Sequence, residues 1–469
     1  MIPLLNLSNS VLFVYYLISN LFYFVLLITA FVSAARHRQR LSSLRLETLD
    51  DSPFTPPISI LVPAHDEASN ITENVTALLS LDYPALQIIV INDGSEDETL
   101  EVLKSEFALR ATSVLYVPQI ASAPVQALYT SALDDRLLVL DKAAGGTKAD
   151  AANAGLNAAT SPYVAVIDAD SVLQKDALVR IGAEIFSAAV EVIAVGGIVR
   201  VLNGSMVSGG QIREIRLPKR PIEVLQVIEY LRAFLIGREA WSALNMLPII
   251  SGAFGVFSRE RMMRVGGFRT NAIGEDIDLV VRMHRSLLQE HKRYRMPFVP
   301  EPTCWTQVPQ TLRALGRQRA RWQKGLLDVL WASRDMLFRP RYGRFGCVML
   351  PYLWVFELAA PVVEIVGLSS IILAAVLGVL SKTFLIQFAI YGYAFATLIS
   401  IGAVVQEEIT VRRYHRWSDV ARLLLFCLAE HFPYRQINMW WRLRGMWQYL
   451  RGNVAWEKSE RSAFATTTK

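Results

Sequence analysis

The chain has 469 residues, of which 52% are hydrophobic, a higher fraction than a soluble enzyme usually carries. The formal net charge of +6 is modest, and the basic residues cluster beside apolar stretches. This distribution favours contact with anionic lipids and argues against a nucleic-acid partner. The spacing of Cys304, Cys347 and Cys427 fits neither a zinc site nor a disulfide framework. Two of the three lie in later apolar runs of the chain, so packing is the better interpretation of these cysteines.

The N-terminal part of the chain predicts a membrane anchor. Residues 11–35 form an almost uninterrupted apolar run, and about 20 apolar residues suffice to cross the hydrocarbon core of a bilayer. Residues 1–10 contain no Lys or Arg, so we expect a retained anchor and not a secretory signal. The basic residues 36–40 should lie in the cytosol, which puts Met1 outside.

Further apolar runs predict a multi-pass protein of the cytoplasmic membrane. The run from Phe345 to Val405, interrupted near Lys382, predicts two or three crossings. The weaker run from Val420 to Leu428 is compatible with a short crossing or with a helix in the interface. The predicted organisation is an anchor with a basic linker at 1–51, a cytosolic α/β domain with an interfacial helix at 52–340, transmembrane or interfacial helices at 341–438, and a basic, Trp-rich cytosolic tail at 439–469.

Between the anchor and the second apolar run, short apolar segments alternate with helical patterns. The segments 58–62, 87–91, 136–140 and 163–167 are rich in β-branched residues and predict buried parallel strands. The stretches 71–81 and 148–159 predict helices. This alternation predicts a doubly wound α/β sheet, whose ligands bind at the carboxyl ends of the strands.

Acidic residues follow three of the predicted strands. Asp66 and Glu67 come after the first strand, Asp93 after the second, and Asp168 and Asp170 after a later one. Two carboxylates one residue apart at a strand end can hold a hard divalent ion, which in turn binds a diphosphate. A single Asp-Ala-Asp triplet is more often a turn or a helix cap, so its neighbours decide between the two interpretations.

Two neighbouring segments suit the parts of a nucleotide. Residues 91–95 place Asp93 before a glycine at a strand end, which suits a nucleoside base or ribose, although Asp-Gly-Ser alone is simply a good turn. Residues 145–155 combine flexible glycine backbone with Lys148, which suits phosphate groups. The alternative for this second segment is a loop that enters a helix capped near Thr147.

Two later motifs carry further candidate groups. Glu275 and Asp276 open a helix after a glycine, where a carboxylate can act as general base for an acceptor hydroxyl; alone, such residues are ordinary partners of the helix dipole. In residues 318–322, Arg321 can bind phosphate in bidentate fashion and Trp322 can stack on a sugar ring. A basic, aromatic interfacial helix is the alternative for this segment.

In this order, the motifs resemble those of the processive family-2 glycosyltransferases, the group that contains cellulose, chitin, hyaluronan and poly-N-acetylglucosamine synthases. The resemblance covers Pro57 to Gly325 and is closest to the poly-β-1,6-N-acetylglucosamine synthase-like branch. It implies a GT-A type domain that holds donor and acceptor together. It also implies a UDP-sugar donor, Mg²⁺ or Mn²⁺ as cofactor, and inverting transfer to a growing polysaccharide.

The resemblance also implies roles for particular residues. The implied metal ligands are Asp168 and Asp170, and the implied base is Asp276 with Glu275 beside it. The implied donor-binding residues are Asp66, Glu67, Asp93, Lys148, Asp150, Asp168, Gln318 and Arg321, and the implied acceptor-binding residues are Ser251, Gly252 and Trp322. The expected partners are the donor, a glycan or lipid acceptor, membrane lipids, and accessory proteins for export or polysaccharide modification.

The sequence departs from the family pattern at several places. Asp66 stands where relatives commonly carry Asn, and Gln307 stands where Glu is common. No segment resembles a cyclic-dinucleotide regulatory domain, and residues 456–461 resemble only loosely the Trp-centred loop of relatives. Two other functions stay open: single glycosylation of a membrane lipid, and a transport or scaffolding subunit with a vestigial transferase domain.

Overall fold

The computed structural model describes residues 2–43, 55–169, 171–208, 210–410, 414 and 416–453. The predicted metal ligand Asp170 and the segment 456–461 lie outside the described residues. The described chain divides into two compact units. We call residues 36–218 and 242–308 the sheet unit, and residues 2–35, 219–241 and 309–453 the helical unit.

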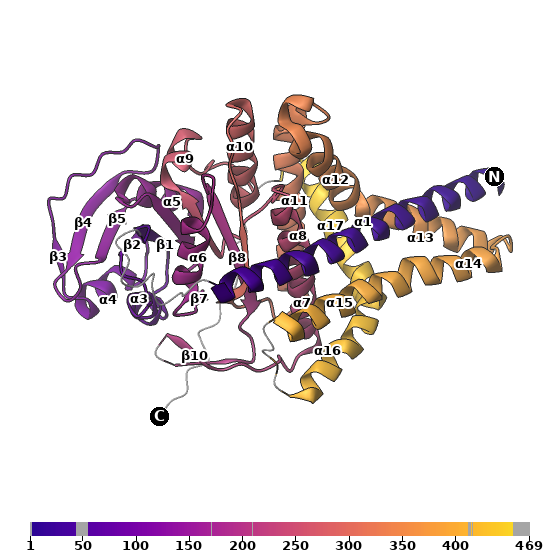
Figure 1. The fold of residues 1–469 in the computed structure, drawn as a ribbon, viewed down its shortest axis with the longest axis horizontal. Coiled ribbons are helices and arrows are strands. Elements are labelled where there is room, and N and C mark those ends of the chain that lie inside the picture. The colour runs from indigo at the N-terminus through magenta and orange to yellow at the C-terminus, as the bar shows by residue number, and fades with distance from the viewer. Residues whose placement is uncertain are drawn as a thin grey trace. The chain divides into compact units, whose positions relative to one another are not determined.

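A mixed sheet forms the centre of the sheet unit (Figure 1). In spatial order its strands within the described residues are β3 (Leu109–Ala111), β4 (Val125–Ser131), β5 (Leu137–Lys142), β2 (Leu86–Asp93), β1 (Ile58–Ala64), β6 (Tyr163–Ile167), β11 (Phe254–Ser258), β8 (Ala194–Val201), β12 (Phe298–Thr306) and β7 (Val172–Leu173). A separate ribbon pairs β9 (Met206–Ser208) with β10 (Gln211–Glu214).

The four strands predicted from sequence form the parallel core of this sheet. β5, β2, β1 and β6 are neighbours and run parallel, with Ile60 opposite Ile88 and Ile88 opposite Leu137. The prediction of buried parallel strands is confirmed. The sheet as a whole is mixed, because β11 runs antiparallel to both β6 and β8 and β4 runs antiparallel to β5.

Helices pack on this sheet through small and aliphatic residues. α5 (Lys148–Ala158) contacts β1 and β2, and a Cβ added at Gly155 would meet Ile91 Cδ1 at 2.8 Å. α10 (Glu275–Gln289) joins the same apolar core through Leu279 and Met283. The sheet unit also contains α3 (Ile71–Leu79), α4 (Thr99–Glu106), α6 (Ala177–Phe186) and α9 (Arg259–Arg264).

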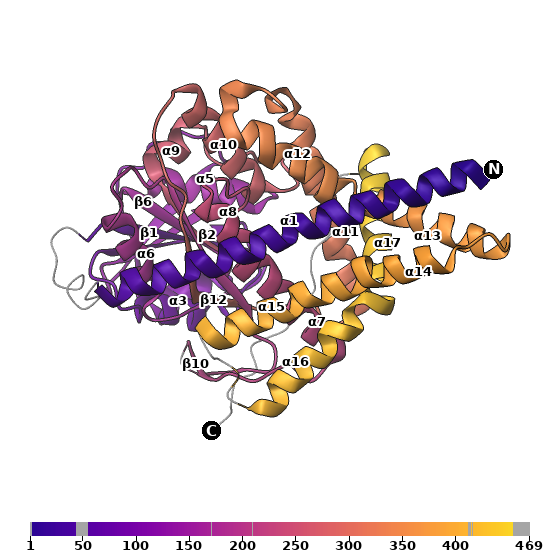
Figure 2. The same ribbon diagram turned by 45° about the vertical axis from the view of Figure 1, so that its right-hand side comes forward.

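The helical unit contains the apolar segments (Figure 2). Its main elements are α1 (Ile2–Ser43, up to residue 35), α7 (Pro221–Leu231), the π-helix η1 (Arg232–Arg238), α11 (Leu312–Ala332), α13 (Ala360–Val376), α14 (Lys382–Phe388), α15 (Phe395–Thr410), α16 (Trp417–Ala429), the π-helical turn η7 (Glu430–Tyr434) and α17 (Arg435–Leu450). α1 and α13 lie side by side, and the Ser370 hydroxyl donates to Asn9 Oδ1 at 2.9 Å.

The unit bounds differ from the predicted domain bounds at two places that matter for the site. Residues 219–241 and 309–340, which the sequence placed with the α/β domain, cluster with the apolar helices. α7 contacts α15 and α16, and α11 contacts α17, which explains the grouping of both ranges. The predicted domain limits at 51, 340 and 438 stay predictions.

Two helices in the described residues are long and apolar enough to cross a membrane, Leu7–Arg40 and Lys382–Thr410. The segments Phe345–Leu358 and Ala360–Val376 would add a third span if this pair, bent by 43°, crosses as one. The run at 420–428 lies in α16, whose 13 residues make a helix about 20 Å long, shorter than the roughly 30 Å hydrocarbon core.

The cysteines follow the packing prediction in part. Cys304 and Cys427 are buried, as expected for packing roles. The prediction is wrong for Cys347, which is exposed on the surface of the apolar segment 345–358.

Candidate active site

The candidate site lies at the edge of the sheet where β1, β2, β5 and β6 end. β11 runs antiparallel to β6, with Phe254 opposite Ile167, so the loop before β11 enters the sheet where β6 leaves it. The Asp168 amide donates to the Ala253 carbonyl at 3.4 Å across this junction. The topology therefore brings residues 251–253 next to the Asp168 strand end.

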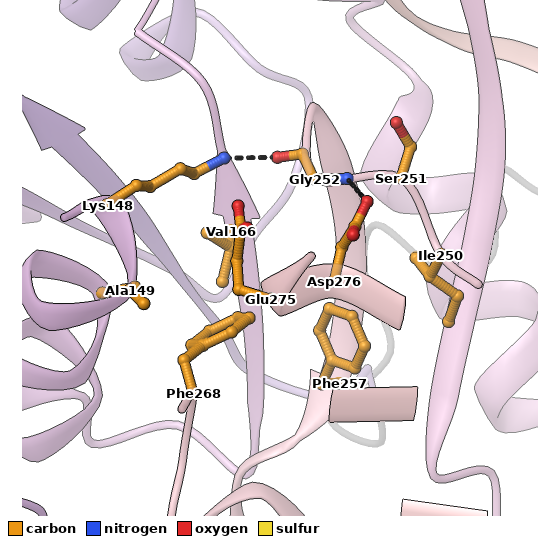
Figure 3. A pocket seen from close by; sticks show the side chains of 11 residues that line it. Lys148, Ala149, Val166, Ile250, Ser251, Gly252, Phe257, Phe268, Glu275 and Asp276 are labelled. Carbon is orange, nitrogen blue, oxygen red and sulfur yellow. Dashed lines mark hydrogen bonds between the residues drawn. The ribbon is translucent and has the colours of Figure 1, made fainter. Parts of the chain in front are cut away.

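A small pocket at this edge gathers five of the predicted site residues. Lys148, Ser251, Gly252, Glu275 and Asp276 line it (Figure 3). The Lys148 ammonium donates to the Gly252 carbonyl at 2.6 Å, and the Gly252 amide donates to Asp276 Oδ2 at 3.4 Å. The start of α5, the loop before β11 and the start of α10 thus meet around one glycine.

Asp168 belongs to the same group through Lys148. The ammonium of Lys148 forms an ion pair with Asp168 Oδ1. Burial of this ammonium opposes its charge, but the surrounding carboxylates, led by Asp168, outweigh that cost and raise the pKa of Lys148 above its ordinary value. Lys148 is therefore a fixed positive charge among acidic groups.

The floor of the pocket is apolar. Val166 from β6, Phe257 from β11, and Ile250 and Phe268 from loops line it beneath the charged groups. An apolar surface keeps the local dielectric constant low, which strengthens each electrostatic interaction above it. Charges at the rim of this pocket therefore act on a bound substrate more strongly than they would in open solvent.

Several buried contacts hold α10, whose first turn carries the candidate base. The His284 ring bonds to the Tyr294 hydroxyl at 2.7 Å and to the Leu247 carbonyl at 2.9 Å, and burial lowers the pKa of His284 to about 4. The Asp278 carboxylate is buried and pairs with Arg282 at 2.7 Å and with Arg269 at 3.3 Å. Asp278 therefore fixes the helix, and Asp276 and Glu275 remain the candidates for chemistry.

The donor set at Asp168 fits a divalent ion that is shared with substrate. Within the residues that the structure describes, no group of three or more His, Cys, Asp and Glu side chains is placed to hold a metal ion. Mg²⁺ at phosphate sites typically takes one or two carboxylates and completes its shell with water and phosphate oxygens. Asp168 Oδ1 is paired with the Lys148 ammonium, so a metal ion at Asp168 would lie next to this ammonium.

Lys142 is a residue of this edge that the sequence analysis missed. Its side chain is completely buried and pairs with the carboxylate of Asp93 and with Asp150 Oδ2, the latter at 2.8 Å. In the parallel register of β2 and β5, Asp93 lies opposite Lys142. The available signal was a lysine at the end of one predicted strand and an aspartate at the end of its neighbour.

The Lys142 cluster holds the glycine turn before α5. The Gly145 amide donates to Asp93 Oδ1 at 2.8 Å, and the Ala123 amide donates to Asp150 Oδ1 at 3.0 Å. A Cβ at Gly145 would lie 1.9 Å from Asp150 Oδ2, so only glycine fits there. The structure brings Asp93 and Asp150 together, but around Lys142, and the predicted donor-binding role of both residues is untested.

The predicted helix cap is also present. The Thr147 hydroxyl accepts a hydrogen bond from the Asp150 amide at 3.2 Å, immediately before α5. A capped helix start and a phosphate-binding loop are compatible, because the cap satisfies one amide and leaves the Lys148 ammonium directed at the pocket. The alternative interpretation of this segment is therefore confirmed without excluding the functional one.

We expect Asp150→Asn to lower stability more than donor affinity. The substitution removes one of the two carboxylates around Lys142, and hydrogen bonds to charged groups contribute about 1.5–3 kcal/mol. The thermal unfolding midpoint of the purified full-length chain and the Kd for UDP are the measurements. Glu191→Gln, which breaks a partly exposed pair with Arg261, is the matched control and should cost at most about 1 kcal/mol. A large rise in the Kd for UDP at unchanged stability would make Asp150 a donor ligand instead.

Asp66 and Glu67 connect two loops at the same edge. Asp66 has a positive φ of 56°, and its Oδ1 accepts from the Glu96 amide at 2.9 Å. The left-handed conformation is one that Asp and Asn tolerate better than most residues. The Glu67 side chain is buried, and the backbone amide of Glu67 donates to Thr99 Oγ1 at 2.9 Å.

The remaining predicted residues lie on α11 in the helical unit. Gln318, Arg321 and Trp322 follow one another along this helix, and 44% of the Trp322 surface is exposed. The guanidinium of Arg319 lies 4.4 Å from the centre of the Trp322 ring. That these residues meet the pocket of the sheet unit stays a prediction.

Comparison with known proteins identifies the family. Residues 59–227 match the model of glycosyl transferase family 2, and residues 163–403, slightly more than half of the 469 residues, match that of glycosyl transferase family group 2. The chain belongs to the family-2 glycosyltransferases. The predicted enzyme class is confirmed, and the GT-A type of fold is supported by this membership together with the mixed sheet.

Individual relatives are similar over much of the chain. A poly-beta-1,6-N-acetyl-D-glucosamine synthase of Staphylococcus epidermidis is 26% identical over 374 residues, which cover 78% of each chain. The synthase of the same name from Staphylococcus aureus (strain COL) is 28% identical over 307 residues, or 64% of this chain and 62% of its own. Among solved structures, a mannosyltransferase of Pyrobaculum calidifontis in complex with GDP-Man and Mn²⁺ is 20% identical, covers 88% of this chain and 99% of its own, and gives a TM-score of 0.48.

Proposed function

We propose that this protein is a membrane-bound, inverting glycosyltransferase that moves a sugar from a UDP-sugar to a hydroxyl of a growing polysaccharide. The observation that carries the proposal is the group of Lys148, Asp168, Gly252 and Asp276 at the end of β6. This group combines a cation that can bind a diphosphate with a carboxylate that can take the proton of a hydroxyl. The relatives named poly-beta-1,6-N-acetyl-D-glucosamine synthase favour N-acetylglucosamine as the sugar.

The proposed reaction is a single displacement. Asp276 takes the proton of the acceptor hydroxyl while its oxygen forms a bond to the anomeric carbon of the donor sugar. The bond between that carbon and the diphosphate oxygen breaks, and the nucleoside diphosphate leaves with the electron pair. The Gly252 amide orients Asp276 through Oδ2, and the Lys148 ammonium attracts the diphosphate whose charge increases.

Asp168, together with Asp170, is the proposed holder of Mg²⁺ or Mn²⁺. The ion supplies further neutralisation of the diphosphate charge when bound. The chain's own part is to provide carboxylate oxygens at the end of β6, next to Lys148, where the phosphates are expected. Asp93 remains the proposed contact of the nucleoside, oriented by Lys142 and by the Gly145 amide.

Accurate placement of the acceptor is the task of the residues before β11 and of α11. A displacement of about 1 Å can cost on the order of a hundredfold in rate. Ser251 and Gly252 line the pocket beside Asp276 and are the proposed acceptor contacts there. Gln318 and Arg321 are proposed to contact the donor phosphates, and Trp322 is the proposed platform for the end of the glycan.

Product size is the experiment that tests this function. Membranes that contain the protein are supplied with a panel of radiolabelled UDP-sugars, and the product is sized by gel filtration. A labelled polymer from UDP-N-acetylglucosamine, absent with Asp276→Asn, supports the proposal. A single-sugar product on a lipid would replace it with the lipid glycosyltransferase function, and no turnover of any UDP-sugar would favour a transport or scaffolding role.

The proposed topology puts the active site on the cytosolic side, where nucleotide sugars are made. In a variant without Cys304, Cys347 and Cys427, a cysteine at residue 5 should react with a membrane-impermeant maleimide in intact cells. A cysteine at Leu133, which is 71% exposed, should react only after lysis. Removing the native cysteines first is necessary because Cys347 is exposed. The reverse labelling pattern would contradict the topology and the donor class together.

A further inference from the structure

Arg319 connects the exposed ring of Trp322 to the interior of the helical unit. Both residues lie on α11 one turn apart, and the guanidinium of Arg319 lies over the indole at 4.4 Å from its centre. Arg319 itself is 9% exposed. A guanidinium in this position attracts the negative face of the aromatic ring, and it also occupies that face.

Glu229 on α7 is the acceptor that holds this guanidinium. Its carboxylate pairs with Arg319 Nη2 and also accepts from the Tyr434 hydroxyl at 2.9 Å and from Asn438 Nδ2 at 3.3 Å. The three donors come from α11, η7 and α17. A buried guanidinium needs such a partner, because an uncompensated buried charge is strongly unfavourable.

α7 and α11 are joined a second time, one turn along α7. The Gln226 side chain is fully buried and donates to the Pro309 carbonyl at 2.8 Å, just before α11 begins. Two side chains of one α7 face therefore fix the start and the middle of α11. The helix that carries Trp322 is held in position and orientation by α7.

We propose that Glu229 is a positioning residue for the acceptor end of the reaction. Through Arg319 it fixes one face of the Trp322 ring, so that the exposed part of the indole is presented in one orientation as the platform for a sugar of the acceptor. This inference rests on the proposed function. It adds Glu229 and Arg319, neither of which the sequence analysis assigned to the site.

The physical reason is the rotational freedom of an exposed aromatic side chain. An indole that is 44% exposed can change rotamer unless a neighbour restrains it, and a mobile ring loses affinity for the sugar that it must order. Arg319 provides this restraint by covering one face, and Glu229 keeps Arg319 from turning outward. The ion pair between α7 and α11 thus restrains the orientation of the exposed Trp322 ring.

A neighbouring ion pair supplies the matched control. Arg232, one turn beyond Glu229 in sequence, pairs with the buried carboxylate of Glu430 on η7 at 2.7 Å. This pair joins η1 to η7 in the same helical unit and also has a buried carboxylate, whose other described contacts are with Ser400 and His431 and not with Trp322. Glu430→Gln therefore reports the effect of losing a buried ion pair without losing the restraint on the ring.

The test uses the full-length protein with UDP-N-acetylglucosamine and measures polymer length against UDP release. Glu229→Gln and Arg319→Met should shorten the product on the order of tenfold, because loss of the cation–aromatic contact releases the ring on which the end of the glycan is placed. UDP release per enzyme should change less than about threefold, because neither residue is placed at the diphosphate or the base. Glu430→Gln should lower the thermal unfolding midpoint by a similar amount and leave product length unchanged.

A double substitution separates positioning from general stability. If Glu229 acts through Trp322, the double variant Glu229→Gln with Trp322→Ala should make a product no shorter than Trp322→Ala alone. Additive shortening, unchanged length in Glu229→Gln, or equal shortening in Glu430→Gln would each overturn the inference. Failure of the proposed function looks different, since the unaltered protein then makes no polymer. In that case the KM for the lipid acceptor is measured in the same variants, and an unchanged KM overturns the inference.

Discussion

Asp276→Asn is expected to lower the rate of sugar transfer by roughly 10²–10⁴, the usual contribution of a general base, while the Kd for UDP stays within about threefold. Asn keeps the size of the side chain and can still accept the hydrogen bond from the Gly252 amide. It cannot take up the proton of the acceptor hydroxyl. Single-turnover transfer and equilibrium binding of UDP, measured on the same preparation, separate these two effects.

Two neighbours on α10 serve as controls for this result. Asp278→Asn should reduce stability and leave chemistry intact, because the Asp278 carboxylate is buried against Arg282 and Arg269. Glu275 lines the same pocket as Asp276, so Glu275→Gln tests the alternative base. If Asp276→Asn loses UDP affinity and keeps most of the rate, Asp276 is a binding residue and Glu275 takes the role of base.

The parallel strands were predictable because each one is encoded locally. Segments such as 58–62 and 163–167 are short, apolar and β-branched, and they are buried in the sheet on both sides. β11 has the sequence Phe-Gly-Val-Phe-Ser, which gives only a weak local signal. Its antiparallel place between β6 and β8 depends on pairing over long distances in sequence, and no local pattern contains that information.

The strand-end aspartates were also predictable, because the strand-end rule needs only the position of each strand. Lys142 was not predictable, because its role depends on the pairing of β5 with β2, which places it opposite Asp93, and on the approach of Asp150 on α5. The position of α7 was not predictable either, because its sequence resembles that of any amphipathic helix of the α/β domain. Arg232, the first residue of η1 directly after α7, pairs with Glu430, a residue 198 positions away, and such a pair is visible only in three dimensions.

Asp168→Asn should lower transfer on the order of a thousandfold, since a bound divalent ion contributes several kcal/mol to transition-state charge and about 1.4 kcal/mol corresponds to tenfold. The affinity for Mn²⁺ in the presence of UDP should fall as well, which calorimetry or paramagnetic resonance measures without reference to activity. Asp176→Asn, at an exposed carboxylate paired with Arg180, is the matched control and should leave both quantities unchanged.

Because Asp168 contacts Lys148, loss of transfer in Asp168→Asn has two explanations. The effect of removing the divalent ion distinguishes them. If Asp168 serves only to neutralise and orient Lys148, then Lys148→Met should reduce transfer as much as Asp168→Asn does, and excess EDTA should have no effect. If Asp168 holds the ion, EDTA should abolish transfer in the unaltered protein and added Mn²⁺ or Mg²⁺ should restore it. Full activity in excess EDTA would contradict metal dependence, and the diphosphate charge would then be balanced by Lys148 and its neighbours alone.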